Sequence, residues 1–170
     1  MRVTLFIVCG IALLLTTAFH LDYRLNLTHS EPIGLYKLEN ETPTRGDLAS
    51  FCLSPENEYL ELSLSRTYLG TSLLCPSGQK PLVKELVGTA GDVVTVHSNT
   101  IQVNTTYYRL TARTHDSKGR SLPHKLHSAV IPKGKALLLS THHQDSFDSR
   151  YFGLVDAAAL HKVTPIFTFN

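Results

Sequence analysis

The N-terminal segment limits most strongly what this chain can be, because it is long, apolar and uncharged. No residue from Val3 to Phe19 carries a charge, and the first acidic residue is Asp22. A helix rises about 1.5 Å per residue, so this run and its flanks just reach across a hydrocarbon core of about 30 Å. We therefore expect a membrane anchor over residues 1–21 and one separate domain over residues 22–170.

A cleaved secretory signal is the alternative interpretation of the same segment. Its charged region would be Arg2 alone, and the end of the run, from Thr17 to His20, has no good small-x-small cleavage site. A retained anchor is favoured for these reasons. Arg2 lies before the run, so the positive-inside rule places the N-terminus in the cytoplasm and residues 22–170 on the other side.

The composition of the chain excludes several classes of protein. Hydrophobic residues make up 42% and charged residues 18%, which is typical neither of disorder nor of a coiled coil. The net charge is only +2 and the basic residues are scattered, so no nucleic acid partner is expected. The oligomeric state does not follow from the sequence.

Cysteine and histidine residues suggest no metal or other cofactor. Three cysteines are too few for a fold built on disulfides. Cys52 and Cys75 could pair in an oxidising compartment, or could be two separate buried thiols. The histidines of the 124–127 and 142–143 segments lie in polar loops without Cys or carboxylate at familiar zinc spacing.

Residues 22–170 read mostly as β structure. One stretch, 57–69, has an apolar side chain every fourth residue and predicts a helix that Gly70 ends. A helical turn is expected over 156–160, and polar loops over 113–127 and 141–150. The expected strands are 34–39, 48–53, 81–88, 93–96, 101–103, 136–140 and 163–168.

Ser30 lies in a segment that suits a reactive hydroxyl. Pro32 and Gly34 follow it closely and predict a rigid, tight turn. Such a turn would hold the hydroxyl on a fixed backbone near the predicted membrane surface. A serine in a turn is far more often structural than catalytic, so the residue needs support from elsewhere.

Lys84 is the second residue with possible chemistry. In a strand, alternation places Lys84 on the same face as Leu82 and Leu86, and Glu85 on the opposite face. Burial beside leucines disfavours the ammonium and lowers its pKa, from about 10.4 toward about 8. A neutral lysine near a serine can act as its general base. The alternative is a strand lysine whose amine reaches solvent.

The third segment runs from Asp145 to Gly153. Asp148 and Arg150 could pair to fix this loop, with the aromatic side chains of 151–152 packed beneath it. On its own this pattern indicates only a well-braced loop.

Taken in order, these segments resemble a known family. Ser-x-Pro-x-Gly-Leu-Tyr begins at Ser30, Leu-Val-Lys-x-x-Val-Gly-x-x-Gly-Asp-x-Val begins at Leu82, and Ser-Phe-Asp-Ser-Arg-Tyr-Phe-Gly begins at Ser146. This order is similar to that of type I signal peptidases. Gly-Leu-Tyr after the serine turn is typical of the conjugative-transfer, or TraF-type, branch. The resemblance covers essentially the whole chain.

The resemblance implies a role for each matching residue. Ser30 matches the nucleophile and Lys84 the general base. Ser146 matches the residue that orients the lysine amine. Thr28 matches the position whose hydroxyl helps to form the oxyanion hole, together with the backbone N–H of Ser30.

The same resemblance gives Asp148 and Arg150 a supporting role, in which they shape the loop that carries Ser146. The chain departs from the family in three places. Glu85 follows the lysine where many members have arginine, the turn of residues 88–92 lacks a proline, and Glu31 stands where general signal peptidases usually have methionine.

The resemblance implies a mainly β, antiparallel signal-peptidase fold with one N-terminal transmembrane helix and a short helix in the body. It also implies a bacterial inner-membrane protein whose catalytic domain faces the periplasm. The expected activity is cleavage of a preprotein, with pilin precursors of a conjugative apparatus favoured, and some relatives also close the product into a ring. A broad-specificity signal peptidase and a non-catalytic assembly protein are the alternatives.

Overall fold

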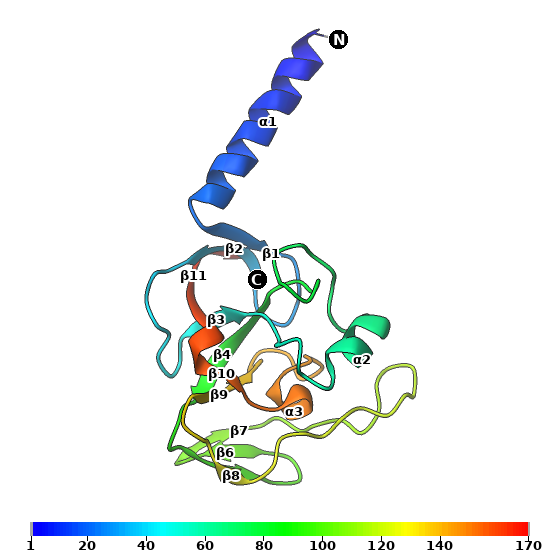
Figure 1. Cartoon of the computed structure of the whole chain (residues 1–170), viewed down its shortest axis with the longest axis vertical. Coiled ribbons are helices and arrows are strands. Elements are labelled where there is room, and N and C mark those ends of the chain that lie inside the picture. Colours follow the sequence, from blue (N-terminus) through cyan, green and yellow to red (C-terminus); the bar gives the residue numbers. More distant parts are fainter. Residues whose placement is uncertain (1, 170) are drawn as a thin grey trace.

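A single helix extends from a body built mainly of β-strands (Figure 1). The computed structural model describes residues 2–169. The helices are α1 (Arg2–His20), α2 (Leu60–Ser65), α3 (Ser149–Phe152) and the 3-10 helix η1 (Ala157–Ala159). The strands are β1 (Tyr23–Asn26), β2 (Ile33–Leu38), β3 (Leu48–Phe51), β4 (Leu82–Gly88), β5 (Val93–Val96), β6 (Ile101–Val103), β7 (Thr106–Tyr108), β8 (Ala129–Val130), β9 (Lys135–Leu139), β10 (Val155–Asp156) and β11 (His161–Phe169).

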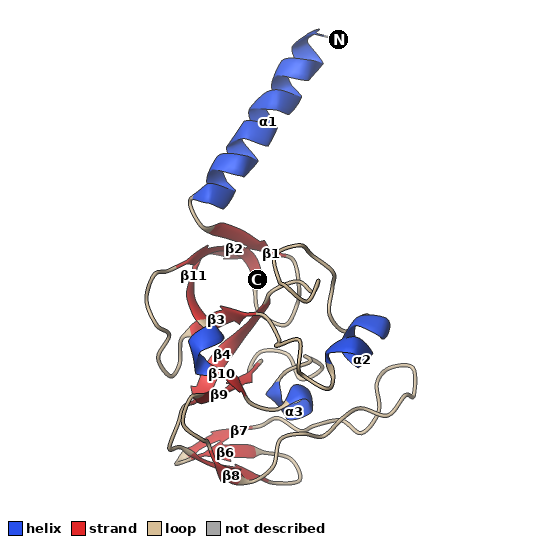
Figure 2. Cartoon of the chain, viewed as in Figure 1, coloured by secondary structure: helices blue, strands red, loops and turns tan. Residues whose placement is uncertain are grey.

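The strands form two antiparallel sheets (Figure 2). The larger sheet has the order β1-β2-β11-β3-β4-β9-β10, and the smaller one has the order β7-β6-β5-β8. The mainly β, antiparallel body expected from the sequence is confirmed. Strands that are distant in sequence lie side by side, since β11 at the C-terminal end is inserted between β2 and β3.

Two hydrophobic clusters cover the two faces of β4 and β9. Leu86 and Leu138 face the first cluster, which also contains residues of β3, α2 and α3. Val87 and Leu139 face the second cluster, which joins the larger sheet to β5 and β6 of the smaller one. Because successive side chains of a strand alternate, both faces of β4 are used and its register is firmly set.

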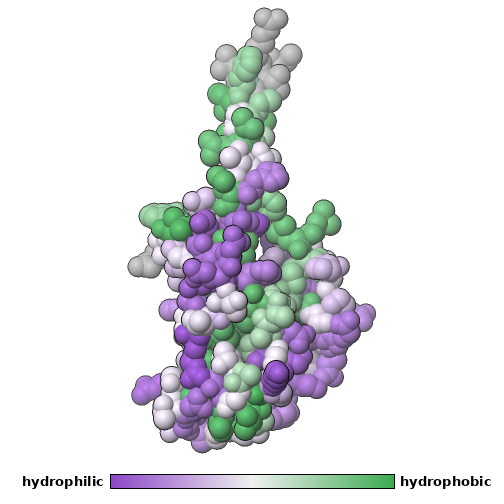
Figure 3. Space-filling model, turned by 60° about the vertical axis from the view of Figure 1, so that its left-hand side comes forward, coloured by the Kyte–Doolittle hydropathy of each residue, from purple (hydrophilic) through white to green (hydrophobic). Residues whose placement is uncertain are grey.

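The helix α1 is apolar and almost entirely exposed. Its large side chains, Phe6, Leu13 and Leu14 among them, make no hydrophobic core with the body. Figure 3 shows hydrophobic surface along the coloured part of the segment that projects from the body. Within residues 2–169, no helix meets both the length and the hydropathy that a membrane crossing needs. The predicted transmembrane helix is therefore not confirmed and stays a prediction.

A helix is present within the predicted range 57–69, but it is shorter than predicted. Only Leu60–Ser65 is α-helical. Thr67 adopts a left-handed conformation, with φ of 61°, and reverses the chain before Gly70 is reached. The apolar spacing continues past the end because Tyr68 packs against Phe147 and Leu69 packs on the first cluster, and a periodic pattern cannot distinguish such contacts from helix.

Gly34 has a different role from the one expected. It lies inside β2 and not in a turn, opposite Thr168 of β11. A Cβ at this position would lie 2.2 Å from the backbone oxygen of Phe167. The close approach occurs where the β2–β11 register shifts between Pro165 and Phe167, so glycine is required by backbone contact.

Substitution of Gly34 by alanine is predicted to destabilise the body. The obstacle is a backbone oxygen that cannot move aside as a flexible side chain could, so we expect a loss of roughly 1–3 kcal/mol. Thermal unfolding of the full chain measures this. Gly10→Ala is the control, because nothing lies within 4 Å of the Cβ added there. An equal melting temperature for Gly34→Ala and the wild-type chain would contradict the prediction.

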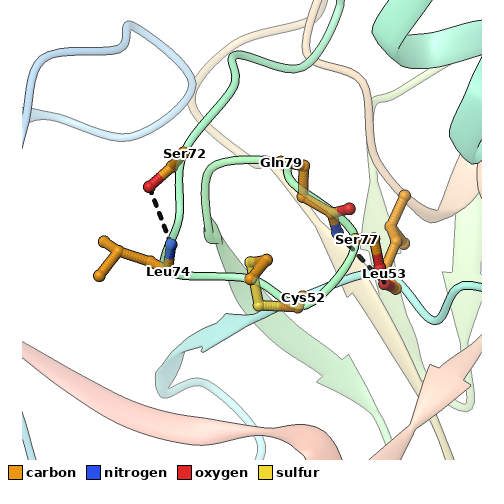
Figure 4. Close-up of a disulfide and its surroundings, with 7 residues drawn as sticks. Cys52, Leu53, Ser72, Leu74, Ser77 and Gln79 are labelled. Atoms are coloured by element: carbon orange, nitrogen blue, oxygen red, sulfur yellow. Dashed lines mark hydrogen bonds between the residues drawn. A yellow bond between two sulfur atoms is a disulfide. The ribbon is translucent and has the colours of Figure 1, made fainter.

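The two cysteines of the body form a disulfide (Figure 4). Cys52, just after β3, is bonded to Cys75, with 5.7 Å between their Cα atoms. The side chains of Ser77 and Gln79 also donate hydrogen bonds to the carbonyl oxygen of Leu53. The loop between α2 and β4 is thus fastened to the end of β3, and the pairing that the sequence left open is formed.

Candidate active site

The turn that carries Ser30 is held by two side chains. Asn26, the last residue of β1, donates from its amide nitrogen to the carbonyl oxygens of Thr28, Glu31 and Pro32, each at 3.1 Å. Tyr36 of β2 donates its hydroxyl to the carbonyl oxygen of Pro32 at 2.6 Å. The backbone on both sides of Ser30 is therefore fixed by strands that flank it in the sequence.

The hydroxyl of Ser30 contacts Thr28. Their oxygens are 3.2 Å apart, and the Thr28 hydroxyl also donates to the side-chain oxygen of Asn26 at 2.7 Å. Since the Thr28 proton is used in that bond, Ser30 is the donor to Thr28. Among the described residues, the Ser30 hydroxyl makes no hydrogen bond to Lys84.

Lys84 lies in the middle of the larger sheet. Its Cα partner on β3 is Ala49, and the following residue, Glu85, pairs with Leu139 of β9. Lys84 lies on the same face as Leu86, as alternation predicted, and its side chain is 1% exposed. Burial lowers the pKa of this amine to about 8, and the carboxylates of Asp148 and Glu31 oppose the shift.

Ser140 connects Lys84 to the serine turn. It directly follows β9, whose Leu139 lies opposite Glu85, so Ser140 reaches the level of Lys84 on the neighbouring strand. The Ser140 hydroxyl donates to the carbonyl oxygen of Ser30. The structure therefore brings the backbone of Ser30 against the part of the sheet where Lys84 is buried.

A buried ion pair fixes the loop after β9. Asp148 and Arg150 are both almost completely buried, and three N–H groups of Arg150, one of them on the backbone, contact the two carboxylate oxygens. The guanidinium also donates to the carbonyl oxygens of Thr111, Gln144 and Ser146. The pairing expected from the sequence is present, and it fixes the segment that carries Ser146.

Ser146 is buried near this ion pair. Its side-chain oxygen has no hydrogen-bond partner among the described residues. The backbone of Ser146 is held on both sides. Arg150 donates to the Ser146 carbonyl oxygen, and the Ser146 N–H donates to the carbonyl oxygen of His143. The expected hydrogen bond to the Lys84 amine is not formed here, and the Ser146 hydroxyl is left available for one.

Sequence reasoning missed three residues that shape the site. Asn26 could have been found from the Asn-x-Thr spacing before the serine, which is typical of a local Asx turn. Ser140 carried no signal, because its contact with Ser30 spans 110 residues. Tyr36 belonged to the Gly-Leu-Tyr motif, but its hydrogen bond to the carbonyl oxygen of Pro32 was not predicted. Within residues 2–169, no group of three or more potential metal ligands gathers.

Comparison with protein families assigns the chain to a class. The family model described as signal peptidase, peptidase S26, matches residues 1–167. The match includes the turn that carries Ser30, the strand that carries Lys84, and the loop of Ser146 that the Asp148–Arg150 pair holds. The chain therefore belongs to the signal peptidase family S26.

Curated relatives place the chain within a branch of that family. It is 34% identical over 151 residues to the conjugal transfer protein TraF of Agrobacterium fabrum, covering 87% of this chain and 84% of the relative. It is 29% identical over 168 residues to a plasmid transfer protein TraF of Escherichia coli, covering 96% and 93%. A signal peptidase I from Enterococcus faecalis is a structural neighbour with 21% identity, coverage of 74% and 99%, and a TM-score of 0.43.

Removal of the Asp148 carboxylate is predicted to destabilise the body strongly. Asp148→Ala leaves the Arg150 charge buried without its partner, which typically costs roughly 3–5 kcal/mol. Denaturant unfolding measures the loss. The control is Glu58→Ala, which breaks an exposed pair with Lys125 and is expected to cost less than about 1 kcal/mol. Equal losses for the two variants would contradict the prediction.

Proposed function

We propose that this chain is an endopeptidase that uses Ser30 as nucleophile and Lys84 as general base. The observation that carries the proposal is the burial of Lys84 on a sheet face, next to the backbone of the Ser30 turn. A buried amine with a pKa of about 8 can lose its proton near neutral pH, as a general base must. Family membership supports the same chemistry.

The proposed reaction proceeds through an acyl-enzyme. The Ser30 oxygen attacks the scissile carbonyl carbon, and the Lys84 amine takes the hydroxyl proton and passes it to the leaving amine. Water then attacks the ester carbon and releases Ser30. Ser146, whose hydroxyl has no hydrogen-bond partner within residues 2–169, would orient the Lys84 amine. The Ser30–Lys84 approach must tighten when substrate binds, as catalytic hydrogen bonds commonly do.

The negative charge that develops on the substrate oxygen needs donors. In the proposed mechanism these are the Thr28 hydroxyl and the backbone N–H of Ser30. The Thr28 hydroxyl now donates to Asn26, so it must rotate toward the substrate to act. One such donor typically contributes about 10²–10³ in kcat.

We propose that the substrate is a preprotein of a conjugative transfer system, with a pilin precursor favoured. The support is the similarity over most of the chain to proteins named for conjugal and plasmid transfer. If the amine of the product's own N-terminus replaces water in the second step, the product is a ring. Broad signal-peptide cleavage would indicate the housekeeping function instead.

We propose further that α1 holds the body at the periplasmic face of the inner membrane. The helix is apolar and exposed, and it projects from the end of the body where β1 and β2 lie (Figure 1). Leu25 on β1 and Phe167 and Phe169 on β11, which pairs with β2, also have exposed apolar side chains. The disulfide between Cys52 and Cys75 fits an oxidising compartment. This arrangement would present Ser30 close to the end of a substrate's signal helix.

Loss of either reacting group is predicted to abolish processing. Ser30→Ala removes the nucleophile, and Lys84→Met replaces the amine by an apolar chain of similar size, so the fold is kept. Co-expression with a pilin precursor and intact-mass measurement of the product tests this, and a further loss of one water shows ring closure. Lys118→Met, at an exposed position, is the control. Wild-type processing by Lys84→Met would exclude the dyad.

The activity is predicted to rise with pH through about 8. Only the neutral amine accepts the Ser30 proton, and its fraction grows as pH passes the pKa of Lys84. The measurement is kcat/KM for a fluorogenic peptide substrate from about pH 6 to about pH 9.5. A profile that is flat over this range, with chemistry rate-limiting, would contradict a lysine base.

A further inference from the structure

Glu31, the residue after the proposed nucleophile, is an unexplained buried acid. Its side chain is 1% exposed, and within residues 2–169 neither carboxylate oxygen has a hydrogen-bond partner. The Ser140 hydroxyl donates to the carbonyl oxygen of Ser30, but it lies near enough to Glu31 to oppose the rise of its pKa. A buried carboxylate without a partner is costly. Asp148, the other acid buried at the site, is by contrast satisfied by Arg150 and by the backbone N–H of Ser140.

Charged and polar groups of several elements act on Glu31. Lys84 and Glu85 approach from β4, Asp148 from the residue before α3, Ser140 from the end of β9 and Tyr36 from β2. Lys84 is the cation of this set, and no hydrogen bond joins the two side chains within the described region. Their geometric link is Ser140, which lies level with Lys84 on the neighbouring strand and donates its hydroxyl to the carbonyl oxygen of Ser30, the residue before Glu31. Across this link the two side chains interact through their charges.

The two groups titrate unusually close together. Burial raises the pKa of Glu31 from 4.5 to about 7, and the charge of Lys84 opposes this shift. Burial lowers the pKa of Lys84 from 10.5 to about 8, and Asp148 and Glu31 oppose it while the Arg150 charge adds to it. The charge of each group opposes the shift that burial imposes on the pKa of the other, so the ionisation of one affects the ionisation of the other.

We propose that Glu31 is a positioning residue whose buried charge acts on the reaction through Lys84, by holding the amine in its protonated form. An opposite charge at short range stabilises an ammonium, so an ionised Glu31 delays the release of the free base as pH rises. The effect sets the lower end of the active pH range. The inference rests on the proposed function, in which Lys84 is the base.

The charge of Glu31 can be removed in two ways. Glu31→Gln keeps the shape of the side chain, and Glu31→Met replaces it by an apolar chain of similar length. Glu85→Gln is the matched control, because Glu85 is adjacent to Lys84 in sequence but lies on the other face of β4, where Thr141 donates to it. Thermal unfolding of each full-length variant verifies that it is folded.

The proton of Lys84 is followed directly by NMR of the full chain labelled with ¹³C at the lysine Cε atoms. The Lys84 resonance is identified by its loss in Lys84→Arg. We expect its titration midpoint to fall by roughly one pH unit in Glu31→Gln and Glu31→Met, the lower end of what a close opposite charge produces, and to stay in place in Glu85→Gln. An unchanged midpoint in both Glu31 variants, or an equal fall in the control, overturns the proposal.

The pH dependence of cleavage gives the second readout. The rising limb of kcat/KM is expected to move to lower pH in the two Glu31 variants by the amount seen in the NMR titration. If Glu31 had a purely structural role, its variants would change the amount of folded protein without moving this limb. If the Lys84 midpoint shifts but the limb does not move, the proposed effect of Glu31 on the reaction is wrong. A wild-type chain that cleaves nothing, with the midpoint shift intact, counts against the proposed peptidase and not against the Glu31–Lys84 interaction.

Discussion

The buried pairing of Asp148 with Arg150 is the interaction on which the site most depends. The carboxylate binds the guanidinium and also accepts from the backbone N–H of Ser140, while the guanidinium holds three carbonyl oxygens from two loops. Because each charge is matched by a partner and by directed hydrogen bonds, the pair can be buried without a large net penalty. The loop of Ser146 and the end of β9 thereby become one rigid support, and that support contacts the turn of Ser30 through Ser140.

The site combines features of a signal peptidase with a departure from the family pattern. The family model spans nearly the whole chain, and the relatives named for conjugal transfer cover most of its length. Lys84 is buried where the resemblance implies a base, yet the residue after Ser30 is an acid and not the methionine usual in general signal peptidases. In the proposed mechanism, whose chemistry depends on the proton of Lys84, Glu31 adds a second titrating group near that amine.

The alternation of side chains was sufficient to predict the face of β4 on which Lys84 lies. A strand has only two faces, and Leu86 and Val87 pack on different hydrophobic clusters, one on each face. The pairing of Asp148 with Arg150 was also predictable, because both residues belong to one short loop. The contact of Ser140 with Ser30 was not, since it joins segments 110 residues apart and depends on how the sheet closes. Short strands such as β8 and β10 have two residues each and no periodicity to detect. The candidate site residues and the Asp148–Arg150 pair thus came from local pattern and family resemblance, whereas contacts between distant segments came only from the tertiary structure.

The irregularity in β4 has a consequence for how the protein can change over evolution. Between Leu86 and Gly88 the pairing with β9 shifts by one residue, so that Val87 is an extra residue on β4. Lys84 lies before this shift and the contacts with the smaller sheet lie after it. A one-residue insertion or deletion between Lys84 and Gly88 would move the side chains on one side of it to the opposite face of the sheet. Either the Lys84 amine or the apolar side chains that contact the smaller sheet would then be exposed. Length changes are therefore expected to accumulate in the surface loops, whereas the spacing from Lys84 to Gly88 has almost no freedom to vary.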